Sequence, residues 1–271
     1  MKIITVVVSF ALFAFCAPAA LRASGLVVEK WKYDPETKIL SLKLVNTSGK
    51  LITGYGWSVI HSYADGTTDA LPDGQPSGGS SAEMLSGWID DEMRKGTPTE
   101  GLFRDSIGFL PEAIKYDTQP MLKDVVDVKA IIDYVIYADC TAEVQNKAAF
   151  EWAMSRRKDE LAGLEKVREI IEQALADQND PVGTARVELV RLSDTLARKG
   201  RTGDLEPPQP DPQALLNAIS DLDMNRQGYD RLGNPTSNLT PRESLEKYLA
   251  ETEKHIALLL PHTQITPTSE K

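Results

Sequence analysis

The spacing of apolar residues changes once along this chain, near residue 142, and that change constrains the fold more than any other feature. Before it, apolar residues occupy every second position, as where Leu40, Leu42 and Leu44 alternate with Ser41 and Lys43. This alternation is typical of a strand with one face in water. After it, apolar residues recur at every third or fourth position, as on one face of a helix. The 271 residues therefore predict an α+β fold with strands first and helices second.

Turn-forming residues divide the first part into short strands. Residues 26–33 and 38–46 flank the turn Tyr33-Asp34-Pro35-Glu36-Thr37 and predict a hairpin. Further strands are predicted at residues 54–63, 83–89, 106–116 and 125–138, with a loop at 65–82 that is rich in Gly, Pro, Ser and Asp. Several short strands joined by turns, without helical spacing, indicate an antiparallel β-sandwich.

The second part carries four apolar stripes at helical spacing, and we expect a helical region over residues 142–260. A loop with four prolines interrupts it at residues 200–212. Three helices begin at Asp180-Pro181, Asp211-Pro212 and Thr240-Pro241, where a capping side chain precedes a proline in the first turn. Because Pro261 ends the last helix, residues 261–271 are predicted to be a disordered tail.

Residues 1–23 are predicted to be a secretory signal peptide. Lys2 precedes an apolar run of 13 residues from Ile3 to Phe15, and Ala17-Pro18-Ala19 offers a cleavage site. Cleavage is expected within residues 19–24, which makes the protein secreted or periplasmic, with no later membrane span. The alternatives are a retained anchor and a lipoprotein acylated at Cys16, although Phe15 stands where a lipoprotein has a small residue.

Composition excludes several classes of function. The formal net charge of −10 argues against a nucleic-acid partner, which requires a basic surface. Two cysteines and three histidines argue against a disulfide scaffold and against thiolate or histidine metal centres. We therefore expect no cofactor and no metal. Signal cleavage would leave Cys140 as the single cysteine, unpaired within the chain.

The candidates for chemistry each have a simpler structural interpretation. Residues 221–225 resemble half of a calcium loop, but Arg226 and Leu232 occupy the positions that need Gly and Glu, so a polar helix end is favoured. An exposed acidic loop is favoured over a calcium site for residues 65–73. A packed or surface side chain is favoured for His61. The acids considered as calcium ligands are Asp65, Asp69 and Asp73.

Three further groups of residues also have both a functional and a structural interpretation. Cys140 with His255 or His262 could form a nucleophile pair, but a structural thiol is favoured. The four tryptophans could form a saccharide-binding platform, with Trp57 the best candidate for an exposed ring, but core positions are favoured; they are Trp31, Trp57, Trp88 and Trp152. The run Arg156-Arg157-Lys158 indicates a solvated helix face. No catalytic, cofactor-binding or metal-binding residue is therefore assigned, and the ligand-binding residues stay unknown.

Two sequence patterns concern strand ends. Tyr63-Ala64-Asp65-Gly66-Thr67 recurs as Tyr137-Ala138-Asp139-Cys140-Thr141, which predicts similar turns after two strands or is a chance similarity. Residues 44–52, followed by a strand and Tyr63-Ala64-Asp65-Gly66, resemble the V-x-N-x-S-x-K-x-I … D-G pattern of FxLYD-like and related immunoglobulin-like domains of secreted bacterial proteins. Cys140 stands where that pattern would again have Gly. The resemblance implies an immunoglobulin-like β-sandwich at residues 24–141 and no catalytic residue.

These observations predict a secreted or periplasmic, non-enzymatic binding or assembly protein of unknown ligand. Its expected interaction is with a protein partner or with a second copy of itself. The loop at residues 65–82 is expected to carry recognition, because binding residues concentrate in loops on rigid scaffolds. The alternatives are a cell-envelope hydrolase with a carboxylate site and a structural, self-assembling envelope protein. Inward-facing acids in a deep cleft would favour the hydrolase.

Overall fold

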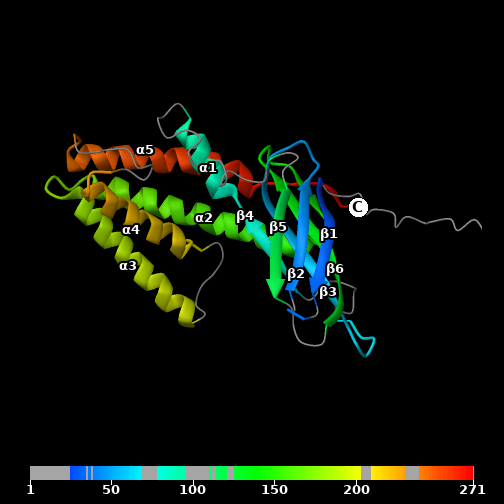
Figure 1. Ribbon diagram of the computed structural model, residues 1–271. Coiled ribbons are helices and arrows are strands. Elements are labelled where there is room, and N and C mark those ends of the chain that lie inside the picture. The colour runs from blue at the N-terminus through cyan, green and yellow to red at the C-terminus, as the bar shows by residue number, and fades with distance from the viewer. Residues whose placement is uncertain are drawn as a thin grey trace, which may run out of the picture.

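The computed structural model describes residues 25–34, 36–37, 39–68, 78–95, 110, 114–120, 125–202, 209–229 and 238–270. Over these residues the chain has a mixed α/β fold with antiparallel sheets and five α-helices, which confirms the predicted combination of strands and helices (Figure 1). The predicted signal peptide lies outside the described residues. No helix within them is long and apolar enough to cross a membrane.

One sheet has three strands in the order β1-β2-β5, namely β1 (Leu26–Asp34), β2 (Ile39–Asn46) and β5 (Ile114–Pro120). The predicted hairpin is confirmed, because β1 and β2 pair antiparallel with Tyr33 opposite Leu40. In β2 the alternating residues Leu40, Leu42 and Leu44 are all buried. One face of this sheet therefore belongs to the core, as the period of two requires.

The second sheet has five strands in the order β4-β3-β6-β7-β8. Its centre is formed by the long strands β3 (Ile52–Tyr63) and β6 (Val125–Tyr137), which pair antiparallel and correspond to two predicted strands. Strand β4 (Gly78–Glu83) forms one edge. At the other edge, β7 (Ala142–Val144) pairs in parallel with β8 (Pro267–Glu270).

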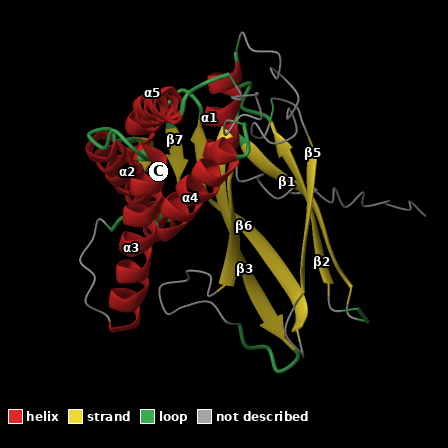
Figure 2. Cartoon of the chain, turned by 90° about the vertical axis from the view of Figure 1, so that its left-hand side faces the viewer, coloured by secondary structure: helices red, strands yellow, loops and turns green. Residues whose placement is uncertain are grey.

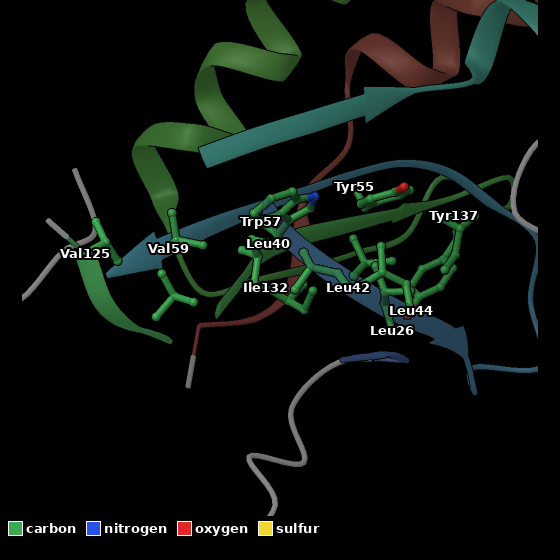
Figure 3. Close-up of a cluster of buried hydrophobic side chains, with 13 residues drawn as sticks. Leu26, Leu40, Leu42, Leu44, Tyr55, Trp57, Val59, Val125, Ile132 and Tyr137 are labelled. Carbon is green, nitrogen blue, oxygen red and sulfur yellow. The ribbon is translucent and has the colours of Figure 1, made fainter. Parts of the chain in front are cut away.

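Side chains of both sheets meet in one buried cluster (Figure 3). Leu40, Leu42 and Leu44 of the three-stranded sheet lie in it together with Trp57 and Tyr137 of the five-stranded sheet. Trp57 is 1% exposed, so the interpretation of this ring as a core residue is confirmed.

The helices lie beside the five-stranded sheet (Figure 2). They are α1 (Leu85–Arg94), α2 (Lys147–Ala174), α3 (Pro181–Thr202), α4 (Pro212–Arg226) and α5 (Pro241–Leu259). The last four share a second core cluster, in which Val167, Leu189, Leu215 and Leu245 are fully buried or nearly so. The predicted apolar stripes therefore pack against each other.

Three helix starts have the predicted caps. Asp180 Oδ1 accepts a hydrogen bond from Gly183 N at 2.8 Å, and Asp211 Oδ1 accepts one from Gln213 N at 2.9 Å. Thr240 and Glu243 form a complete capping box at the start of α5. These side chains satisfy amides that have no partner inside the helix.

The structure differs from the sequence predictions in several segments. Residues 78–82 were predicted as part of a loop and form strand β4, and residues 142–144 were predicted as the start of the helical region and form strand β7. The strand predicted at residues 83–89 is wrong beyond Glu83, because helix α1 begins at Leu85 and buries Leu85, Ile89 and Met93 at helical spacing. The tail predicted to be disordered from residue 261 continues from α5 as a 3₁₀ helix (Leu260–Thr263) and then as β8. Its ordering has a physical reason, since Ile265 is buried against the second sheet and its neighbours His262 and Thr263 are also buried.

Candidate functional site

A partly enclosed cavity of about 390 Å³ lies where strand β4 and helix α1 meet helices α2, α4 and α5. Figure 1 shows these elements converging beside the edge of the five-stranded sheet. The cavity walls carry many charged and polar side chains. They include Glu83, Ser86, Arg156, Arg157, Asp159, Glu160, Asp211, Asp221, Tyr248 and His255.

Helical spacing brings the α2 side chains to one wall. Arg156, Glu160 and Leu164 follow each other at intervals of four residues and all line the cavity. Helix α4 lies close to α2 at Gly163. A Cβ added at this glycine would be only 2.8 Å from the Cβ of Ala214 in α4. Glycine at position 163 thus permits the close approach of the two helices.

Arg157 and Glu83 form a two-point ion pair at one end of the cavity. Arg157 Nη2 donates to Glu83 Oε1 at 2.8 Å and Nε donates to Oε2 at 3.1 Å. Arg157 is 1% exposed, whereas the Glu83 side chain is 37% exposed. The prediction of a solvated face therefore holds for Arg156 and Lys158, which are exposed, and is wrong for Arg157.

The sequence contains a pattern that indicates the burial of Arg157. It follows the buried residues Phe150 and Met154 at helical spacing, so it occupies a core position of α2. A charged residue at such a position indicates an oppositely charged partner close to it. That partner, Glu83, is 74 residues away in the sequence, and the local pattern carries no information about it.

Three further acids of the cavity hold the surrounding elements in place. Asp159 Oδ1 accepts a hydrogen bond from Gln209 N at 3.0 Å. Asp211 caps α4, and its own amide donates to the backbone oxygen of Asp159 at 2.9 Å. Asp221 Oδ2 accepts a hydrogen bond from the hydroxyl of Tyr248 at 3.1 Å. These bonds connect α4 to α2 and α5.

Glu160 lies between α1 and α5. Its Oε1 accepts a hydrogen bond from Ser86 Oγ at 3.2 Å and is 3.9 Å from Nε2 of His255, an ion pair only when the histidine is protonated. Burial raises the pKa of Glu160, and the negative charges of Glu83 and Asp211 raise it further, against the opposing effects of Ser86 and Arg157. The carboxyl of Glu160 therefore stays protonated to a higher pH than an exposed glutamate.

The charges of the cavity do not cancel. Its described lining holds five carboxylates and two guanidiniums, which leaves a net charge of −3 when His255 is neutral. Between the charged groups lie apolar surfaces, from Leu164, Pro210, Ala214 and Ala218. Such a cavity favours a polar ligand and disfavours an anion.

The predicted candidates divide between this cavity and other places. His255 lines the cavity, whereas His262 lies in the 3₁₀ helix with its ring 4.9 Å from the ring of Trp88. Cys140 has no disulfide, and burial followed by the charge of Asp139 raises the pKa of its thiol. A thiol held protonated is a poor nucleophile.

Of the aromatic candidates that the structure describes, one tryptophan is exposed and His61 is buried. Among the tryptophans, Trp152 is 53% exposed, and the guanidinium of Arg156 lies 5.3 Å from its ring centre. Trp57, the best candidate for an exposed ring, is thus buried, and the favoured core position is wrong for Trp152. The side chain of Trp31 lies outside the described residues. His61 is buried in β3, 7% exposed, as expected for a packed side chain.

Where the structure describes them, the residues suggested as calcium ligands have other partners. Residues 221–225 belong to helix α4, where Asp223 binds Arg186 of α3 at 2.7 Å. Asp65 accepts a hydrogen bond from Thr67 N within its own turn, and Asp69 and Asp73 lie outside the described residues. The part of the chain that the structure describes contains no group of three or more residues able to hold a metal ion.

The recognition loop predicted at residues 65–82 is described only at its ends. Residues 65–68 belong to the turn after β3, residues 78–82 belong to β4, and residues 69–77 lie outside the described part. The cavity thus offers a site that the sequence analysis did not identify.

Comparisons with known proteins leave the chain without an established family. No protein-family model matches it, and no curated protein matches it significantly. A solved structure of a hypothetical protein from Peptoclostridium difficile 630 is 15% identical and covers 48% of this chain and 90% of its own, with a TM-score of 0.25. Likeness at that level carries no argument about fold or function.

Proposed function

We propose that this chain is a binding protein that takes a small polar ligand into the cavity between β4, α1, α2, α4 and α5. The observation that carries the proposal is the cavity itself, which gathers Glu83, Glu160 and His255 from distant parts of the sequence. A volume of about 390 Å³ lies within the ordinary range of small-molecule sites. Binding, rather than catalysis, is the function that its chemistry supports best.

A hydrolase with a carboxylate site is the second candidate, favoured by the raised pKa of Glu160. A protonated carboxyl could act as a general acid. Hydrolysis of a glycosidic bond also needs a second carboxylate free to act as base or nucleophile. Both oxygens of Glu83 accept hydrogen bonds from Arg157, and Asp211 is occupied as a helix cap. This arrangement supports binding over hydrolysis.

The proposal includes a location and a domain division. The signal-peptide pattern of residues 1–23 supports a secreted or periplasmic protein. The shared buried cluster of the two sheets, together with the resemblance carried by residues 44–66, supports an immunoglobulin-like β-sandwich at residues 24–141. On this view the helical region at 142–260 supplies most of the cavity wall.

The test uses a variant that closes the cavity mouth. Asn217 is exposed and lines the cavity, so Asn217→Trp should block entry without disturbing the core. Ser220→Trp, at an exposed position of α4 outside the lining, is the matched control. Thermal unfolding is measured against pools of polar metabolites sorted by charge.

We expect at least one pool to raise the melting temperature of the wild type and of Ser220→Trp, but not of Asn217→Trp. A ligand at 100 times its Kd stabilises by about 2.7 kcal/mol, which corresponds to a rise of several degrees. The proposal fails if no pool produces a shift, or if the shift persists in Asn217→Trp.

A further inference from the structure

We infer that the ligand of this cavity is a small organic cation, with one or more ammonium groups on a short aliphatic chain. The inference rests on the proposed function, because it names the ligand class of the same cavity. The cavity provides the space for a ligand, and the charge and chemical nature of its lining determine which class of ligand binds.

The first argument concerns which carboxylates are neutralised. Glu83 has a cationic partner, Arg157. Asp159 and Asp211 accept hydrogen bonds from backbone amides, and Glu160 accepts one from a hydroxyl. A neutral donor orients a carboxylate without cancelling its charge. Among the described lining residues, Arg156 is then the guanidinium left to oppose these three acids, and in a partly enclosed cavity such an excess attracts a cation more strongly than in water.

The second argument concerns a contact point for an ammonium group. Glu160 Oε1 accepts a hydrogen bond from Ser86, but within the described residues no donor bonds to its Oε2. The Glu160 side chain is 22% exposed, so an incoming ammonium group can reach it. An ammonium group supplies up to three donors and a full positive charge, which is what this carboxylate lacks.

The third argument separates an organic cation from a metal ion. A calcium ion needs six to eight oxygen ligands arranged around it, and no such group exists among the residues that the structure describes. The cavity is also far larger than one ion. Leu164, Pro210, Ala214 and Ala218 line it between the carboxylates, and these side chains suit the methylene groups of an aliphatic chain.

The experiment compares three probes that share a four-carbon chain and differ in charge. Calorimetric titrations of the full chain use 1,4-diaminobutane as the cation, 1,4-butanediol as the neutral control and succinate as the anion. Calcium chloride is titrated separately. We expect heat of binding from the diamine alone, with an affinity that falls as salt is added.

A charge-matched pair of variants locates the contact. Glu160→Gln keeps the shape of the side chain and removes its charge, so we expect it to weaken diamine binding at least tenfold. Glu165→Gln makes the same change in net charge at an exposed position of α2 outside the cavity lining, and should leave the affinity within twofold.

The inference is overturned if butanediol or succinate binds as tightly as the diamine, or if the diamine does not bind at all. It is also overturned if calcium displaces the diamine. Equal loss in Glu160→Gln and Glu165→Gln also overturns it, because it indicates a non-specific charge effect. If another class of compound binds and Asn217→Trp blocks it, the proposed function stands while the inference falls. If diamine binding survives Asn217→Trp, both fall.

Discussion

At the scale of single residues, the repeated pentapeptide produces the same turn twice. In both copies the tyrosine amide donates to the threonine carbonyl at 2.9 Å, and the aspartate accepts from the threonine amide. The fourth residue has a positive φ in each copy, +83° at Gly66 and +61° at Cys140. Glycine adopts this conformation without cost, whereas a residue with a Cβ is strained there.

Substitutions at position 140 isolate this strain. Cys140→Ala keeps a Cβ on a residue in the left-handed conformation. It loses the sulfur, which belongs to a side chain packed against the buried cluster that includes Ile136, Phe150 and Met154. Cys140→Gly loses the same sulfur but relieves the strain. We therefore expect Cys140→Gly to be about 1 kcal/mol more stable than Cys140→Ala, measured by urea unfolding.

The other copy of the turn provides the control. Gly66→Ala introduces a Cβ at φ +83°, where nothing lies within 4 Å of it, so a loss of about 1 kcal/mol can only come from the backbone. Equal stability of Cys140→Gly and Cys140→Ala would show that the turn at Cys140 is unstrained.

At the scale of elements, the Arg157–Glu83 pair connects the edge strand β4 to the long helix α2. The two partners differ in surroundings, since Arg157 is 1% exposed and Glu83 is 37% exposed. A buried charge without its partner is strongly destabilising, whereas a half-exposed one is reached by water. The pair therefore orders the junction that forms the cavity, and its two halves are not equivalent.

This asymmetry predicts unequal effects of removing either partner. Glu83→Ala leaves a buried guanidinium uncompensated and should cost about 3 kcal/mol or more. Arg157→Leu leaves a carboxylate that can be solvated and fills part of the vacated space, so we expect a smaller loss. Chemical unfolding of both variants checks the order, and a reversed order would contradict the assignment of Arg157 as the buried partner.

At the scale of the whole molecule, the C-terminal segment connects the helices to the five-stranded sheet. After α5 it packs His262, 1% exposed, against Trp88 of α1, and then pairs β8 with β7. Burial, with a contribution from the charge of Arg157, lowers the pKa of His262 to about 4, against the opposing charge of Asp139. The folded state therefore requires this histidine to be neutral.

The pH dependence of stability follows from this requirement. The ordinary pKa of histidine is 6.5, so between pH 6.5 and 4 the unfolded chain binds a proton at position 262 that the folded chain does not. His262 thus contributes full stability above pH 6.5, and up to about 3 kcal/mol of it is lost as the pH falls to 4.

The difference between wild type and His262→Gln isolates this effect. Asp133 and Glu160 have raised pKa values, caused first by burial, and so they favour stability at low pH. Because both proteins contain them, their effects cancel in the comparison. We expect the free energy of unfolding of the wild type to fall more steeply below pH 6.5, and parallel curves would contradict the buried, neutral state of His262.

Local sequence was sufficient for most of the elements. The alternation at Leu40, Leu42 and Leu44 identified a strand and its buried face, and the Asp-Pro and Thr-Pro pairs located three helix starts. These features depend on neighbours within a few residues, and so the sequence carries them directly. The short helix α1 was missed, because its helical spacing is carried by only three residues, Leu85, Ile89 and Met93, over ten positions.

The candidate site depended on tertiary structure. Arg157 differs from Arg156 only by its position on the helix, and its burial follows from β4, whose Glu83 is 74 residues away. Glu160, Ser86 and His255 meet because α1, α2 and α5 pack together. The sequence by itself thus determined most of the strands, the four long helices and the caps of three of them, since local forces act between near neighbours. Only the tertiary structure decided which charges are buried together, because burial and pairing depend on residues that the chain brings close from far apart.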